Sequence, residues 1–299
     1  MIASEQQMNS DQYPFDIIEP HQQNVPFVLN SPHSGRYYPR EFLNASRLTT
    51  HTIRSSEDFL VDDLYAPSVM LGIPMLNAVF PRAYLDVNRE PYELDQAMFL
   101  DELPAYANTR SIRVSSGLGT IARIVSEGQE IYATKLDVSE ALDRIECLYK
   151  PYHACLRHLL AKTHVQFGHA VLLDCHSMPS NSSVHSAEMR PDIILGDRFG
   201  SSCAPALTHN ARNILRDMGY HVELNKPYAG GFITEHYGRP GNGMHALQIE
   251  VNRELYMNET TLSKSDNFEA LSQDLYEFVD KLIMIVADEL VGSQPLAAE

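Results

Sequence analysis

Residues 169–177 read HAVLLDCHS, an apolar run that ends in polar residues. The run from His169 to Cys175 predicts a buried central strand. Side chains alternate between the two faces of a strand, so Asp174 and His176 lie on the same face and Cys175 on the other. Asp174 can then accept a hydrogen bond from a neighbouring metal-binding imidazole. The alternative interpretation of His176 is a histidine whose hydrogen bonds are satisfied at the sheet edge.

Strand-like and helix-like segments alternate on both sides of this run. Further strands are predicted at residues 25–30, 73–79, 83–87, 192–195, 221–224 and 245–251. Helices are predicted at residues 59–65, 139–167 with a kink at Pro151, 205–218 and 267–290. This order predicts an α/β fold with a largely parallel or mixed sheet.

No repeat, low-complexity tract or flexible linker divides the chain of 299 residues. We therefore expect one catalytic α/β domain over residues 25–292. A polar N-terminal extension is expected at residues 1–24 and a C-terminal tail at residues 293–299.

The bulk composition favours a soluble protein that does not bind nucleic acid. The formal net charge is −16, and nucleic-acid binding needs Lys and Arg to neutralise phosphates. We predict no membrane association, because no apolar run is long enough to cross a bilayer and the first residues do not look like a signal peptide. Four cysteines without a metal-binding or redox spacing fit a reducing compartment, so we expect a cytoplasmic protein.

Three candidate site residues follow predicted strands or lie near their ends. His33 follows residues 25–30, His176 follows residues 169–175, and Glu250 lies near the end of residues 245–251. Ligands of open α/β sheets collect beyond the carboxyl ends of the strands, so these three side chains can meet in one crevice. A single loop histidine such as His33 is otherwise a surface or structural residue.

The pair Glu57-Asp58 supplies adjacent carboxylates just before a predicted helix. One interpretation is a helix start, where Ser and Asp are preferred. The other is a carboxylate that completes a zinc site with two histidines, because catalytic zinc commonly takes three protein ligands and leaves one position for water. The residues themselves do not choose between these two interpretations.

Glu250 and Arg89 are the remaining candidates for chemistry. Glu250 is an acid inside an apolar strand, where a carboxylate needs a partner or a task, and it is the best candidate for a general base. Arg89, with Arg82 nearby in sequence, can hold a substrate carboxylate through two parallel hydrogen bonds. The alternative is a structural pair between Asp86 and one of these arginines.

A cysteine or serine nucleophile is not supported. Cys175 and His176 are adjacent in the predicted strand, so their side chains point to opposite faces and cannot form an activated pair. The chain also lacks a G-x-S-x-G nucleophile elbow.

Five blocks in order resemble the N-formylglutamate amidohydrolase family. They are NSPHSG (30–35), SEDFLVDDLY (56–65), PRAYLDVNR (81–89), LLDCHSMPS (172–180) and GGFITEHYGRPGNGMHALQIEVN (230–252). The resemblance implies a fold similar to the zinc carboxypeptidases and the aspartoacylase group, with a central mixed sheet flanked by helices. It also implies hydrolysis of N-formyl-L-glutamate to formate and glutamate, within the histidine degradation that the family name suggests.

The resemblance further implies roles for individual residues. His33, His176 and a carboxylate from Glu57-Asp58, favoured as Asp58, are implied as ligands of one Zn²⁺ ion per chain. Glu250 is implied as the general base. The residues implied to bind a small anionic N-acyl amino acid are Arg82, Asn88, Arg89, Thr234 and His236, the last two on a Gly-rich loop at residues 228–243 that closes over the site.

Three alternatives remain open at this level. Another small N-acyl amino acid could be the substrate of the same chemistry. The chain is also compatible with a zinc exopeptidase that acts on peptides. A binding protein without activity on the same fold is the alternative from another class. The oligomeric state does not follow from the sequence.

Overall fold

The computed structural model describes residues 14–125, 128–180 and 190–292, with side chains described as far as Val286. Residues 1–13 of the predicted extension and the predicted tail at 293–299 lie outside this description. Backbone contacts divide the chain into two compact units. The first unit comprises Met1–Ile17, Asn30–Leu60 and Leu76–Leu159, and the second comprises Ile18–Leu29, Val61–Met75 and Leu160–Glu299.

The main sheet is mixed and has seven strands in the order β1-β3-β2-β4-β7-β5-β6. The strands span Phe15–Ile18 (β1), Phe27–Ser31 (β2), Met75–Ala78 (β3), Ala170–Met178 (β4), Ile193–Gly196 (β5), Val222–Leu224 (β6) and Met244–Asn252 (β7). All residues of β2, β3, β4 and β5 are buried, which explains why these strands are largely apolar in sequence. The predicted α/β class with a mixed sheet is therefore confirmed.

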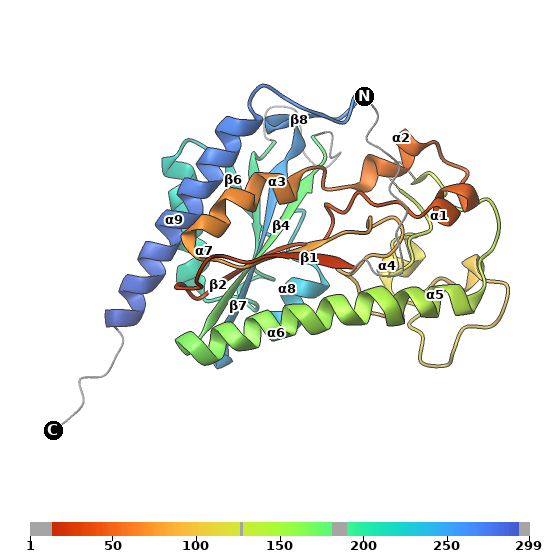
Figure 1. Cartoon of the computed structure of the whole chain (residues 1–299), viewed down its shortest axis with the longest axis horizontal. Coiled ribbons are helices and arrows are strands. Elements are labelled where there is room, and N and C mark those ends of the chain that lie inside the picture. Colours follow the sequence, from red (N-terminus) through yellow and green to blue (C-terminus); the bar gives the residue numbers. More distant parts are fainter. Residues whose placement is uncertain (1–13, 126–127, 181–189, 293–299) are drawn as a thin grey trace. The chain divides into compact units, whose positions relative to one another are not determined.

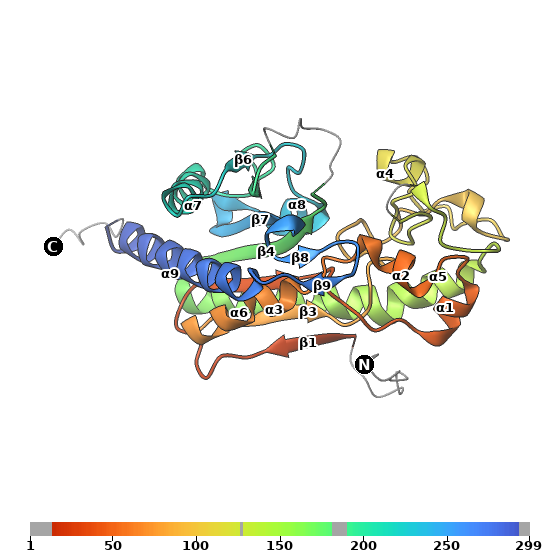
Figure 2. The same ribbon diagram turned by 90° about the horizontal axis from the view of Figure 1, so that it is seen from above.

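The second unit holds the longest strand pairing. β4 pairs with β7 in parallel over their full nine-residue length, and β5 pairs antiparallel with β7 and parallel with β6. Its helices include α3 (Val61–Tyr65), α7 (Pro205–Asp217), α8 (Phe232–Tyr237) and α9 (Phe268–Gly292). The predicted amphipathic spacing of α9 is confirmed, since Phe268, Leu271, Leu275, Phe278 and Leu282 are all buried. This face of α9 lies against α3 and α7 (Figures 1 and 2).

The first unit contains shorter elements around a second apolar core. Its helices are α1 (Arg40–Ala45), α2 (Thr50–Ile53), α4 (Ile112–Ser115), α5 (Val138–Arg144) and the π-helical segment η5 (Ile145–Tyr149). A helix α6 (Lys150–Phe167) continues from η5, so the π-helical segment ends just before Pro151, where a kink was predicted. The core residues of this unit are Phe42, Ile53, Ala83, Ala122, Val125 and Ile131.

Smaller elements complete the described chain. They are the 3-10 helices η1 (Arg54–Ser56), η2 (Ala66–Leu71), η3 (Gln96–Met98), η7 (Pro240–Asn242) and η8 (Arg253–Leu255), and the hairpin strands β8 (Met257–Asn258) and β9 (Ser263–Lys264). None of the helices within the described ranges has the length and apolar character needed to span a bilayer.

Three sequence predictions were wrong in detail. Residues 83–87 form no strand: the amides of Tyr84 and Leu85 donate to the Pro81 carbonyl, so the chain turns there and is buried by packing. The predicted loop 228–243 contains the helix α8 and the 3-10 helix η7. The short strand β1 was not predicted: it has four residues and lies within residues 1–24, which were expected to form a polar extension.

Candidate metal and substrate site

His33 is positioned by the tight turn that follows β2. A side chain at Gly35 would place its Cβ 2.0 Å from the Phe80 carbonyl oxygen, so only glycine fits beside this histidine. His33 is buried, and its Nε2 lies 2.8 Å from Asp86 Oδ1. An ionised carboxylate only accepts, so Nε2 carries the proton and donates to Asp86. The second ring nitrogen, Nδ1, lies 3.4 Å from Oδ2 of Asp58, the acid favoured as a metal ligand.

Glu57 and Asp58 have different surroundings although they are adjacent. Both oxygens of Glu57 accept from Arg54, at 2.8 and 3.0 Å, and the Tyr38 hydroxyl donates to Oε1 at 2.6 Å. Burial, together with the charge of Glu57, raises the pKa of Tyr38 well above its usual value. Glu57 is therefore held by a structural network, whereas Asp58 is the acid that faces His33.

Asp86 connects His33 to the predicted substrate-binding arginines. It accepts from the Asn88 amide at 2.8 Å and from Arg82 Nη2 at 3.0 Å, and Arg89 Nη2 lies 3.6 Å away. Burial opposes the charge on Asp86, but the charges of Arg89, His33 and Arg82 outweigh it and hold the pKa well below the usual range. The carboxylate is therefore ionised and keeps the His33 ring in one orientation.

The second histidine and the predicted base come from neighbouring strands. His176 in β4 is the direct partner of Glu250 in β7, and Asp174 is the partner of Gln248. Paired residues of a parallel ladder share a face, so these four side chains lie together and Cys175 points away, as predicted. His176 Nε2 lies 3.1 Å from Asp174 Oδ2, and Glu250 accepts from Gln248 Nε2 at 2.9 Å.

One ligand atom each from His33, Asp58 and His176 lies within 4.8 Å of the other two, and all three residues are buried. Nε2 of His33 lies 2.8 Å from Asp86 and Nε2 of His176 lies 3.1 Å from Asp174, so each imidazole has a carboxylate partner. Two imidazoles with carboxylate partners plus one carboxylate form a donor set that fits zinc. The three predicted metal ligands are thus brought together.

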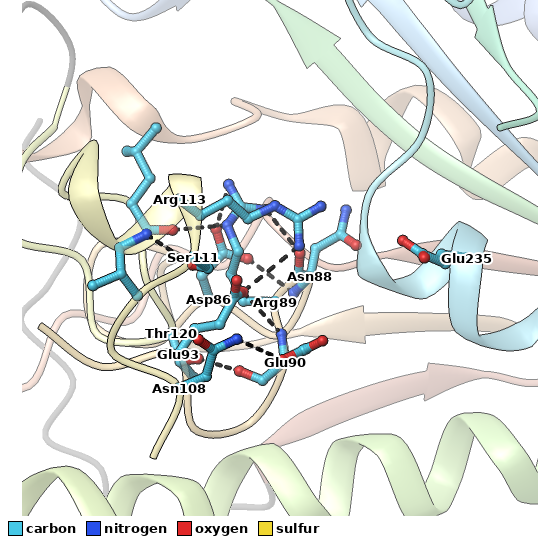
Figure 3. Close-up of polar contacts among 12 residues, drawn as sticks. Asp86, Asn88, Arg89, Glu90, Glu93, Asn108, Ser111, Arg113, Thr120 and Glu235 are labelled. Carbon is cyan, nitrogen blue, oxygen red and sulfur yellow. Dashed lines mark hydrogen bonds and ion pairs between the residues drawn. The ribbon is translucent and has the colours of Figure 1, made fainter. Parts of the chain in front are cut away.

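Arg89 is held at the end of a rigid loop. Its Nε donates to the Leu118 carbonyl at 2.8 Å. Its Nη1 donates to the carbonyl of Asn88, which is labelled with Arg89 in Figure 3, at 2.7 Å. Burial lowers the pKa of Arg89 from its usual value, with Asp86 acting in the opposite direction. The helix behind this loop fixes its backbone: Tyr149 donates to the Arg89 carbonyl at 2.7 Å, and His153 Nε2 lies 2.9 Å from the Val87 carbonyl.

Thr234 and His236 lie on α8 and not on an extended loop. Thr234 is fully buried, with its hydroxyl 3.4 Å from Gln248 Oε1 and 3.5 Å from Asp174 Oδ2. His236 is exposed and stacks on Phe232, with ring centroids 4.9 Å apart. Their predicted contacts with substrate stay predictions.

Sequence reasoning missed two residues of this region. Gln248 lies two positions before Glu250, so the strand alternation that identified Asp174 beside His176 could have identified it too. Arg113 lies on α4, whose short sequence carries no pattern that points to a site.

Comparison with known proteins gives a consistent result. Residues 25–257 match the family model described as FGase: N-formylglutamate amidohydrolase. N-formylglutamate deformylase of Pseudomonas putida is 29% identical over 243 residues, which cover 80% of this chain and 85% of that protein. The enzyme of the same name from Pseudomonas aeruginosa is 28% identical over 265 residues, covering 87% and 93%.

Solved structures agree with these relatives. The crystal structure of N-formylglutamate amidohydrolase from Ralstonia eutropha JMP134 superposes with a TM-score of 0.87 at 34% identity, covering 93% of this chain and all of that one. The gene product Atu2144 from Agrobacterium tumefaciens has the same fold, with a TM-score of 0.65 at 17% identity over 92% and 97% of the two chains.

Proposed function

Because the chain belongs to the N-formylglutamate amidohydrolase family, we propose that it hydrolyses the formyl amide of N-formyl-L-glutamate. The products are formate and L-glutamate. The observation that carries this proposal is the buried group of His33, Asp58 and His176. Two histidines and a carboxylate leave a coordination position for water, which is the arrangement that catalytic zinc needs.

In this proposal His33, Asp58 and His176 hold one Zn²⁺ ion. A bound zinc ion would lower the pKa of water and polarise the amide carbonyl. Asp86 and Asp174 keep the two imidazoles in the tautomer that binds metal, through the contacts at 2.8 and 3.1 Å. These two carboxylates therefore maintain the site without touching the substrate.

Glu250 is proposed as the general base. It accepts the proton of the attacking water and then delivers it to the amine of the departing glutamate. Its position as the ladder partner of His176 supports this role. Gln248 Nε2 donates to Glu250 Oε1 at 2.9 Å, which orients the carboxylate on the face that it shares with His176.

Arg89 and Arg82 are proposed to bind the α-carboxylate of the substrate, with Asn88 beside them. Arg89 is anchored through Nε and Nη1 to two backbone carbonyls, so its guanidinium plane is fixed before substrate arrives. A fixed guanidinium loses little conformational entropy on binding. Its charge and paired N–H donors favour a carboxylate ligand over a neutral group.

The test of the mechanism is Glu250→Gln. We expect zinc content to remain near the wild-type value while kcat for N-formyl-L-glutamate falls by roughly 10²–10⁴-fold, as is typical when a general base is removed. Glu254→Gln, at an exposed glutamate in the turn after β7, is the matched control and should retain activity. Undiminished turnover by Glu250→Gln would contradict the assignment.

A substrate panel separates the proposed activity from its alternatives. N-formyl, N-acetyl and N-succinyl amino acids and dipeptides are compared by kcat/KM. We expect N-formyl-L-glutamate to be among the best substrates. Preference for dipeptides would indicate an exopeptidase, and no turnover of any compound by zinc-loaded protein would indicate a binding protein.

A further inference from the structure

Arg113 lies on a segment that is closely attached to the Arg89 loop. The Asp86 amide donates to the Thr120 carbonyl at 2.9 Å, and the Thr120 amide donates to the Glu93 carbonyl at 2.8 Å. A side chain at residue 119 would place its Cβ 2.3 Å from the Glu93 carbonyl oxygen, so glycine is required for this close approach. The segment that carries Arg113 is thus held against the predicted carboxylate site.

The Arg113 guanidinium has little to hold it within the described residues. Its one ion pair there is with Glu93, at 3.6 Å between Nη1 and Oε2, which is too long for a hydrogen bond. The side chain is 31% exposed, whereas Glu93 is 4% exposed. Arg113 therefore neutralises a buried acid but keeps most of its five N–H donors available.

Arg113 also lies close enough to Arg89 for their charges to interact. Its charge and that of Arg82 both act on Arg89, adding to burial in lowering the Arg89 pKa. Figure 3 shows Arg113 in the same group of polar side chains as Asp86, Arg89 and Glu93. The same group holds the carboxylates of Asp86, Glu90 and Glu93. Those of Asp86 and Glu93 are buried and already lie against arginines, which leaves the guanidinium groups as the ones to which a further anion can bind.

Arg89 alone cannot hold two carboxylates. Its Nε and one N–H of Nη1 already donate to backbone carbonyls, and Nη2 lies towards Asp86. The remaining donors suffice for one bidentate contact. Arg82, which is proposed to share the α-carboxylate with Arg89, already donates to Asp86 at 3.0 Å. A substrate with a second carboxylate therefore needs a further cation, and Arg113 is a partly exposed cation close to Arg89.

We propose that Arg113 binds the side-chain carboxylate and thereby sets a preference for dicarboxylic N-acyl amino acids. This inference rests on the proposed function, because it assumes that Arg89 takes the α-carboxylate. Arg113 contacts substrate but neither metal nor base, so it determines specificity through KM and not through the chemical step.

The test compares Arg113→Gln with wild type on two matched substrates, N-formyl-L-glutamate and its neutral isostere N-formyl-L-glutamine. Losing a charge-assisted contact should lower kcat/KM for the glutamate substrate by roughly 10- to 100-fold, mainly through KM. The glutamine substrate should change by less than about threefold, so the preference for the acid disappears.

Two further variants separate this role from a purely structural one. Arg113→Lys keeps a positive charge beside Glu93 and should recover part of the preference, while Arg110→Gln removes a nearby exposed arginine and should change neither substrate. An equal loss of kcat/KM on both substrates would show that Arg113 only stabilises the fold through its ion pair with Glu93. No loss on either substrate would also overturn the proposal.

Binding of the product provides a readout that does not depend on turnover. In calorimetric titrations Arg113→Gln should weaken binding of L-glutamate by a similar factor and leave L-glutamine unchanged. If wild type hydrolyses neither substrate, the proposed function fails, whereas this titration still decides whether Arg113 recognises the second carboxylate. Equal binding of L-glutamate by wild type and variant would reject the proposal.

Discussion

Two adjacent acids, Glu57 and Asp58, perform different tasks because of their contacts. Glu57 neutralises Arg54 and accepts from Tyr38, with its side chain fully buried. Asp58 faces His33 in the group that can hold a metal. The family resemblance favoured Asp58, but the residues alone could not decide, since only the folded chain brings Tyr38 and Arg54 to one of the two.

The substitutions Glu57→Gln and Asp58→Asn should therefore have opposite effects. Glu57→Gln should lower the free energy of unfolding by roughly 1–3 kcal/mol, because a buried charged hydrogen-bond network is weakened, and should keep its zinc. Asp58→Asn should remove a metal ligand and lose zinc, with a smaller effect on the metal-free fold. Urea unfolding in chelator and elemental analysis measure both.

Each variant is the control for the other in this experiment. Loss of zinc from Glu57→Gln, with retention by Asp58→Asn, would reverse the assignment of ligand and structural acid.

At the scale of elements, the pairing of β4 with β7 defines the site. Alternation in the sequence correctly placed Asp174 and His176 on one face, but it could not show that Glu250 pairs with His176, because strand order and register depend on packing. The same limit explains the wrong strand at residues 83–87. Its apolar residues are buried in the turn that carries Asp86, and burial alone does not make a strand.

His169 lies just before β4 and His245 near the start of β7, and both histidines need to stay neutral. His169 Nδ1 donates to the Phe167 carbonyl at 3.1 Å, and its buried Nε2 has no hydrogen-bond partner in the described part of the chain. His245 Nδ1 accepts from the Ala204 amide at 3.2 Å, which a protonated ring cannot do. Burial lowers the pKa of both histidines, with the charge of His169 adding to the effect on His245.

These histidines should make stability depend on pH in the acidic range. In the folded chain the pKa values of both histidines lie below the ordinary value of about 6.5. At a pH between the folded and the unfolded pKa, the unfolded chain therefore binds more protons than the folded chain. The contribution of the two neutral histidines to the free energy of unfolding is therefore complete above about pH 6.5. It is lost as the pH falls below that value. We expect the thermal midpoint of metal-free protein to drop less between about pH 7.5 and 5.5 in the double variant His169→Gln/His245→Gln than in wild type.

The exposed His209 on α7 offers the control for this measurement. His209→Gln should follow the wild-type pH dependence. Identical pH dependence in wild type and in the double variant would show that the two buried rings do not contribute.

For the whole molecule, the α/β class followed from the alternation of buried strands and helices such as α7 and α9. The individual site residues at strand ends could also be found, because ligands gather there in such sheets. The net charge of −16 says little about the proposed site, because a few arginines such as Arg89 can set a local charge that differs from that of the whole chain. The role proposed for Arg113 could not be inferred from the sequence, because it depends on neighbours such as Glu93 and Arg89 that the fold supplies.

The most direct test is zinc binding by wild type, His33→Ala and His176→Ala, measured by elemental analysis and by thermal unfolding with zinc or with chelator. We predict about one zinc per wild-type chain, and a stabilisation by zinc of roughly 2.7 kcal/mol when free zinc is about 100 times Kd. Each alanine variant should fold in chelator but lose both the metal and the stabilisation. Full zinc content and the same stabilisation in both variants would contradict the metal site.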